Sequence, residues 1–207
     1  VVHLDSVCNS PDLREAHNDM LPAISAFQAK ISLDPELWNA VKTYAQKSES
    51  EELEAVDRRL LDEIVQDFEE SGADLPEEKR NRLQVISSEL AKATQTFSEH
   101  VLDATNEWSI TASEEEELAG LPENAKTAAR QAAIEKLGEE KGANSWIFTL
   151  HAPSMLPVLQ YGDNEELRKK IWTASDRLCV DEPFQNEPLI RKILKLRQER
   201  AEILGKD

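Results

Sequence analysis

Few residues in this sequence have the types and spacing that catalysis requires. The four histidines are His3, His17, His100 and His151, and none of them lies in a His-Glu-x-x-His or His-x-His arrangement. His100 and Asp103 lie within one helical turn of each other and could share a face, but two ligands leave a zinc site half built. We therefore expect a polar pair at this position, and no metal site and no bound cofactor in this chain.

Nucleophile patterns are also missing. Ser154 has no Gly-x-Ser-x-Gly context, and the dispersed glycines form no phosphate-binding loop. Cys8 and Cys179 lie far apart with no Cys-x-x-Cys pair, so we expect two reduced thiols in a cytoplasmic protein. We predict no catalytic residues in this chain.

Acidic residues offer two weaker candidates. The run from Glu114 to Glu117 could be imagined as a cation site, but consecutive side chains point around a helix, so a solvated face is expected. Asp67, Glu69 and Glu70 leave open an independent enzyme that works through carboxylates. Since charged helix faces are ordinary, we do not favour that alternative. The tryptophans at 38, 108, 146 and 172 are expected in the core or at interfaces.

The composition excludes several classes of partner. The chain of 207 residues carries 41 acidic and 24 basic residues, a net charge of −17. Such a surface repels nucleic acid and anionic membranes. There is no apolar run long enough for a membrane span, and no leader pattern is visible. Because the sequence opens on Val1 and stops directly after a helical pattern, we expect a piece of a longer protein.

One long helix, from Asp74 to Trp108, is the predicted centre of the fold. Its apolar residues recur in steps of three and four, and Pro76 with Glu77 and Glu78 suits a first turn. The stripe comprises Leu83, Ile86, Leu90, Ala93, Phe97, Val101 and Ala104. A stripe of this length needs partners along the whole helix.

Further helices are predicted on both sides. Starts are expected at Ser10-Pro11-Asp12, at Asp34-Pro35-Glu36 and from Glu51, with a loop over 47–50. Pro22 should kink or divide the first of these helices. Gly72 should end the third, and the short connection that follows favours an antiparallel hairpin with the central helix. Later helices are expected from a cap at Asp163 and from Asn186-Glu187-Pro188 to Gly205.

Between these helical regions, the pattern predicts a short β-hairpin of 108–111 with 146–150. A capping box at Ser113 and Glu116, a helix over 127–137, a polar turn over 139–145 and a short element between Pro153 and Pro157 accompany it. Glu165 with Lys169, and Glu166 with Lys170, are predicted ion pairs along one helix.

The predicted fold is therefore mainly α: an antiparallel helical bundle with one long central helix and a small two-stranded β-hairpin. We divide residues 1–207 into helical hairpins over 10–106, the β-hairpin and short helices over 107–160, and a C-terminal helical hairpin over 163–205.

Several segments resemble the thimet-type zinc oligopeptidases, the family of oligopeptidase A and dipeptidyl carboxypeptidase. They are DFEESGADLPEEKRNRLQVISSEL at 67–90, FSEHVLDATNEW at 97–108, LAGLP at 118–122, WIFTLHAPSMLPVLQYGDNEELRKKIW at 146–172 and NEPLIRKILKLRQERAEILG at 186–205. The order and number of these segments carry the resemblance. Met155, where the family usually has an aromatic residue, and Cys179, in a divergent loop, depart from it.

The resemblance implies an N-terminal helical region that forms one wall of a channel for short peptides. In this family, zinc and the His-Glu-x-x-His helix lie in a later region, so the resemblance implies that this chain alone is inactive and that its partners are peptides and the missing catalytic part. Weak self-association through apolar surface that the missing part would cover is also expected. The alternative is a helical scaffold or protein-interaction domain with no enzymatic role.

Overall fold

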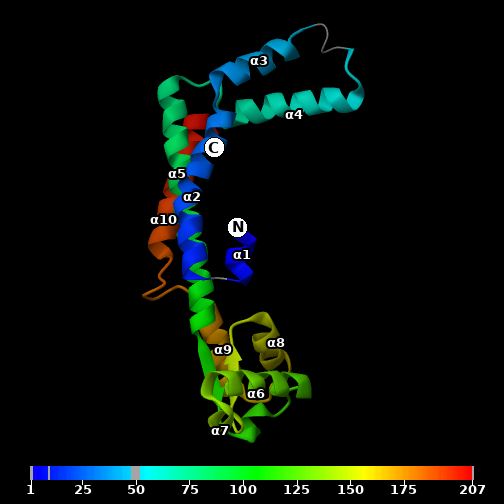
Figure 1. Cartoon of the computed structure of the whole chain (residues 1–207), viewed down its shortest axis with the longest axis vertical. Coiled ribbons are helices and arrows are strands. Elements are labelled where there is room, and N and C mark those ends of the chain that lie inside the picture. The colour runs from blue at the N-terminus through cyan, green and yellow to red at the C-terminus, as the bar shows by residue number, and fades with distance from the viewer. Residues whose placement is uncertain (1, 9, 48–51, 207) are drawn as a thin grey trace. The chain divides into compact units, whose positions relative to one another are not determined.

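The structure is a computed structural model that describes residues 2–8, 10–47 and 52–206. The described chain is mainly helical with one two-stranded antiparallel sheet, which confirms the predicted fold class (Figure 1). It forms two compact units, one of residues up to Thr96 together with Leu189 onward, and one of Phe97–Pro188. The division into three segments stays a prediction.

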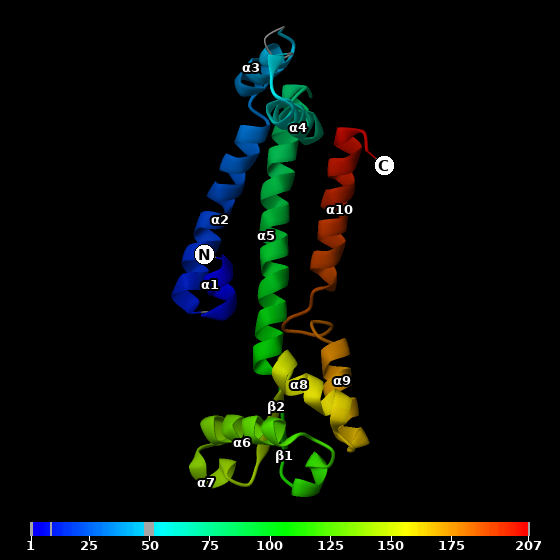
Figure 2. The ribbon, with the colours of Figure 1, turned by 90° about the vertical axis from the view of Figure 1, so that its right-hand side faces the viewer.

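The first unit contains α1 (Val2–Val7), α2 (Pro11–Ser32), α3 (Pro35–Ala45), α4 (Ala55–Ser71), most of α5 (Glu77–Glu107) and most of α10 (Glu187–Leu204). Helices α2, α5 and α10 run alongside one another, with α5 in the middle (Figure 2). Leu83, Ile86 and Ala93 of the predicted stripe are buried.

Local capping sets the starts of α2 and α3 as predicted. The Ser10 hydroxyl accepts from the Leu13 N–H at 3.3 Å, and the Asp34 carboxylate accepts from the N–H groups of Glu36 and Leu37 at 2.9 Å. Pro22 does not divide the helix, because α2 continues through it over 22 residues. The flanking turns of this long helix hold it together where the proline removes one N–H donor.

Helix α4 begins at Ala55, later than the predicted start at Glu51, which lies outside the described residues together with 48–50 of the predicted loop. Gly72 closes α4 in the left-handed conformation, with φ 91°. The predicted antiparallel hairpin of α4 with α5 does not form: α4 packs beside α3 and crosses the end of α5 (Figure 1). A short connection permits a crossing as well as a hairpin.

The second unit is built on β1 (Ser109–Ala112) and β2 (Trp146–Thr149), which pair antiparallel with Ile110 opposite Phe148. The predicted hairpin is therefore confirmed within one residue at each strand. Around it lie the 3₁₀ turn η2 (Glu115–Leu118), α6 (Glu123–Leu137), α7 (Glu139–Gly142), α8 (Ala152–Tyr161) and α9 (Glu165–Asp176). The buried core of this unit includes Leu118, Phe148, Val158 and Ile171.

Several predicted boundaries in this unit shift. The capping box uses Glu114 and Glu117 instead of Ser113 and Glu116, and Asn164 instead of Asp163 caps α9, accepting from the Leu167 N–H at 3.1 Å. Both shifts move the cap by one residue, because neighbouring polar residues can each serve as a cap.

Other elements of the unit are longer than predicted. Helix α6 begins at Glu123, four residues before the expected start at 127, and the polar turn over 139–145 contains the short helix α7. Helix α8 extends from Ala152 to Tyr161 and runs through Pro157.

Candidate functional site

His100 has a structural partner that the sequence did not indicate. Its Nδ1 lies 2.9 Å from the Oδ1 of Asn186, and the Asn186 Nδ2 donates to the carbonyl of Phe97 at 3.2 Å. Asn186 is only 3% exposed. Because the amide oxygen can only accept, His100 donates from Nδ1 in this pair. His100 therefore helps to hold the connection before α10 against α5.

The other histidines are dispersed. His17 is buried, with its Nδ1 3.4 Å from Gln95 Nε2, and the Nε2 of His151 lies 3.1 Å from the Oδ1 of Asn106. His3 is exposed on α1. Over the described ranges, no three His, Cys, Asp or Glu side chains gather as metal ligands would.

The nucleophile candidates have ordinary surroundings. The Ser154 hydroxyl accepts from the Thr149 N–H at 3.0 Å and so fixes the start of α8. Cys8 is exposed, and Cys179 is partly buried. Burial raises the pKa of the Cys179 thiol, which lowers its thiolate fraction and its reactivity.

The acidic candidates face water. Glu114, Glu115 and Glu116 are exposed, and the Glu117 carboxylate accepts from the N–H groups of Ser113 and Glu114. Asp67, Glu69 and Glu70 are also exposed. Hydrogen bonding from Gln66, and then the charge of Lys206, lower the pKa of Glu70, which is opposite to what a general acid needs.

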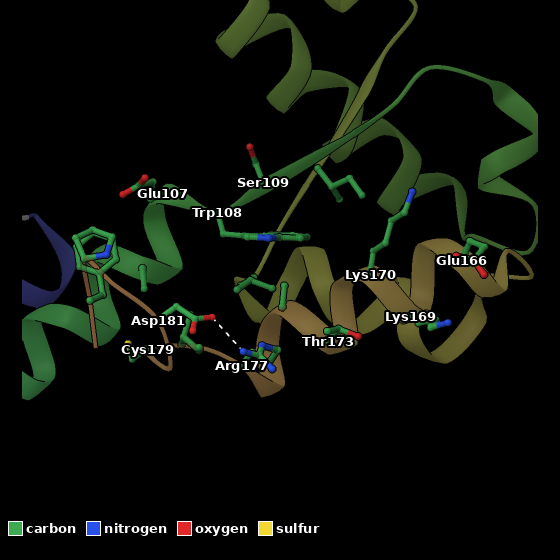
Figure 3. A pocket seen from close by; sticks show the side chains of 17 residues that line it. Glu107, Trp108, Ser109, Glu166, Lys169, Lys170, Thr173, Arg177, Cys179 and Asp181 are labelled. Carbon is green, nitrogen blue, oxygen red and sulfur yellow. Dashed lines mark hydrogen bonds and ion pairs between the residues drawn. The ribbon is translucent and has the colours of Figure 1, made fainter. Parts of the chain in front are cut away.

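A large hollow lies in the second unit, with a volume of about 830 Å³ (Figure 3). Five parts of the unit line it: the end of α5, β1, the residue after β2, one side of α9, and the connection that follows α9. We call it the α9 cavity. Its apolar lining comprises Ala104, Trp108, Ile110, Leu150, Ala174, Leu178, Pro183 and Phe184.

Charged side chains surround this apolar lining. Arg177 donates to Asp181 at 3.1 Å, which neutralises both (Figure 3). Among the described side chains, the predicted ion pairs of Glu165 with Lys169 and of Glu166 with Lys170 do not form. Lys170 instead extends upward from α9 in Figure 3, away from the helix surface along which the pair was expected.

Sequence reasoning missed this cavity. It placed Trp108 and Trp172 in the core or at an interface. Trp108 is partly buried and packs against the core as expected, and it also lines the cavity, whereas Trp172 is 58% exposed. Trp38 and Trp146 are buried as expected. A signal existed in the spacing of Lys169, Lys170, Thr173 and Arg177, which share one side of a helix, but only the fold brings Trp108 to them.

A smaller hollow of about 460 Å³ lies in the first unit between α4 and α10. Asp67 and Glu70 line it opposite Arg197, Arg200 and Lys206, and Lys206 Nζ lies 3.7 Å from Glu70 Oε2. Neither hollow pairs a nucleophile with a positioned base. The α9 cavity is suited to binding, because apolar lining and a few charged groups are what a small ligand requires.

Comparisons with known proteins find a family model at the start of the chain and oligopeptidases over nearly all of it. Residues 1–80 match the family described as Neurolysin/Thimet oligopeptidase, N-terminal domain. Oligopeptidase A of Salmonella typhimurium is 36% identical over 99% of this chain and 30% of that protein. In Arabidopsis thaliana, the Organellar oligopeptidase A, chloroplastic/mitochondrial, is 35% identical, and the Probable cytosolic oligopeptidase A is 34% identical, each over 98% of this chain.

The share of these relatives that is matched is small. The chain spans between 26% and 30% of the length of the three proteins. Over the part of the chain that the structure covers, no helix is both long and apolar enough to cross a membrane.

Proposed function

We propose that this chain is the non-catalytic N-terminal part of a thimet-type zinc oligopeptidase that hydrolyses short peptides. The observation that carries the proposal is the match to oligopeptidase A, which covers nearly all of this chain but less than a third of the relative. Zinc and the residues that activate its water would then come from the remainder of the polypeptide.

In this proposal the chain has a structural role and also helps to recognise the peptide. A long helix with partners along its length supplies one wall of a peptide channel, and the α9 cavity supplies a surface with both apolar and charged groups. We propose peptides and the catalytic region as its partners, and no nucleic acid or membrane, because a net charge of −17 repels polyanions. We propose the cytoplasm as its location, as the name of one Arabidopsis relative also says of that protein.

One observation favours the alternative of a helical scaffold or interaction domain. Four apolar side chains at helical spacing on α2 are 45% to 65% exposed: Met20, Ile24, Phe27 and Ile31. Such a face needs a partner. In the peptidase proposal the partner is the rest of the same polypeptide, whereas a scaffold would bind another protein.

Zinc titration of the 207-residue chain by calorimetry tests the proposal. We expect no tight binding site, because the ligand set lies elsewhere in the proposed enzyme. Stoichiometric tight zinc binding by this chain would contradict its non-catalytic role. The coding sequence beyond Asp207 separates the alternatives: a downstream His-Glu-x-x-His supports the peptidase, and a stop codon supports the scaffold.

A further inference from the structure

The α9 cavity has an aromatic side chain in its lining and positively charged side chains at one end. Trp108 lies across the middle of the cavity, while Lys169 and Lys170 stand on one side of it and Glu107 on the other (Figure 3). Ile110, Leu150 and Leu178 extend the apolar lining. A ligand that fits this arrangement has an apolar side chain with a charged group next to it.

The charges of the two lysines are available to a ligand. Within the described residues, Lys169 and Lys170 form no ion pair and no hydrogen bond, and both side chains are exposed. Arg177 is already neutralised by Asp181 at 3.1 Å. Glu166 lines the same end and weakens the positive field there, but it pairs with neither lysine. The chain as a whole has a net charge of −17 and repels carboxylates. Two neighbouring lysines without an ion-pair partner form a local site that attracts a carboxylate instead.

The size of the cavity limits the ligand. About 830 Å³ is within the range that holds a drug-sized molecule. A single large apolar side chain with the backbone of two or three residues fits such a volume.

We infer that the α9 cavity binds the carboxyl-terminal residue of a short peptide, with the apolar side chain against Trp108 and the terminal carboxylate toward Lys169 and Lys170. The inference rests on the proposed function, because that function makes short peptides the molecules this chain meets. It goes further by naming the end of the peptide that is recognised and the residues that recognise it.

The test compares two forms of one peptide. The isotope-labelled 207-residue chain is titrated with N-acetyl-Ala-Ala-Phe as the free acid and as the carboxyl-terminal amide, followed by NMR at physiological salt. We expect the free acid to bind about tenfold tighter, because charge-assisted contacts to two lysines distinguish the two forms. The indole N–H signal of Trp108, assigned with the Trp108→Phe variant, should shift, whereas those of buried Trp38 and Trp146 should not.

Matched variants show whether the lysines cause the preference. The double variant Lys169→Gln and Lys170→Gln should bind both forms equally. The control pair is Lys192→Gln and Lys195→Gln, which removes the same charge from exposed positions on α10 that do not line the cavity. This control should keep the preference for the free acid. Circular dichroism checks that each variant remains folded.

A third ligand tests whether the cavity recognises the peptide groups or binds any acid that has an apolar part. 3-Phenylpropanoate carries the aromatic ring and the carboxylate but no peptide groups, and we expect it to bind at least tenfold more weakly than the peptide acid. Equal binding by the two would contradict peptide recognition.

Three further results would overturn the inference: no binding of the peptide acid at millimolar concentration, equal binding of acid and amide, or a preference that survives the double lysine substitution. None of these results would bear on the peptidase proposal, whose test is zinc binding.

Discussion

At the scale of single residues, Asp74 joins α3 to the connection between α4 and α5. Its Oδ1 accepts from the Trp38 Nε1 at 2.7 Å and from the Lys42 Nζ at 3.0 Å. Trp38 is 4% exposed and stacks on Phe68, with ring centroids 5.5 Å apart. The Trp38 hydrogen bond, followed by that of Lys42, lowers the pKa of Asp74 below its ordinary value.

This carboxylate should contribute to stability in a pH-dependent way. We expect Asp74→Asn to lower the free energy of unfolding at neutral pH by about 1 kcal/mol, a charge-assisted bond discounted for an exposed carboxylate. A lowered folded-state pKa stabilises the fold above the ordinary aspartate pKa of about 3.9, and this contribution is lost as the pH falls through the folded-state pKa. The difference between the two proteins should therefore shrink below about pH 4.

Urea unfolding followed by tryptophan fluorescence measures this difference at neutral and acidic pH. Asp176→Asn is the matched control, because Asp176 is exposed at the end of α9, and its effect should be within about 0.5 kcal/mol. If Asp74→Asn behaved like this control at neutral pH, the Asp74 contacts would contribute nothing measurable.

At the scale of elements, Asn186 fixes the connection between α9 and α10. Its N–H donates to the Cys179 carbonyl at 2.9 Å, and its side chain joins His100 and the Phe97 carbonyl. The same connection supplies Cys179, Asp181 and other residues to the lining of the α9 cavity. One buried amide thus sets the shape of one cavity wall.

Removing this amide should loosen the wall. We expect Asn186→Ala to lower the free energy of unfolding by about 2 kcal/mol, because partly buried groups on α5 lose a buried partner. Hydrogen exchange over 177–186 should become faster in the variant. Gln185→Ala, which changes the neighbouring residue, should leave this exchange nearly unchanged. Equal exchange in the Asn186→Ala variant and the original chain would contradict the proposed anchor.

A second element-scale prediction concerns the packing of α7 on α6. A Cβ on Gly142 would collide with the backbone of Ile134 and lie 2.8 Å from the carbonyl carbon of Ala133. We expect Gly142→Ala to cost about 1–3 kcal/mol, because neither helix backbone can give way easily. Thermal unfolding measures the loss.

Gly138→Ala is the control for this substitution. Gly138 has φ 83° and ψ 163°, a conformation nearly restricted to glycine, and no other group lies within 4 Å of the place that a Cβ would take. The change therefore introduces backbone strain alone, about 1–3 kcal/mol. A Gly142→Ala variant as stable as the original chain would show that the two helices lie farther apart.

Local patterns in the sequence predicted most elements but not their angles. Ser10, Asp34 and Gly72 make capping contacts with residues close to them in the sequence. The helix ends that they set could therefore be predicted from the sequence. The crossing of α4 over α5 depends on packing beyond the turn, and the sequence therefore favoured a hairpin that does not form. The α9 cavity joins Trp108 to Lys170, which lie far apart in the sequence, so the spacing of the α9 residues alone could not indicate it.

At the scale of the whole molecule, the exposed apolar face of α2 should produce weak self-association. Phe27, at 65% exposure, is the most exposed of its four side chains. We expect sedimentation velocity to show concentration-dependent dimers that Phe27→Glu removes, because burying an added charge opposes the contact. The net charge of −17 keeps this association weak.

Val56→Glu is the control for this prediction. Val56 is 76% exposed on α4, away from the α2 face. This substitution should leave the dimers in place. A clean monomer at high concentration, or equal effects of the two substitutions, would contradict the role of the α2 face.

The central claim is that this chain is the non-catalytic part of a zinc oligopeptidase, and the most direct measurement compares it with the complete natural protein. Both are assayed for zinc content and for cleavage of a quenched fluorescent peptide, with and without a chelator. We predict that the complete protein holds stoichiometric zinc and cleaves the peptide until the chelator is added, whereas the 207-residue chain does neither. Chelator-sensitive cleavage by the chain alone, or a complete protein with neither zinc nor activity, would contradict this claim.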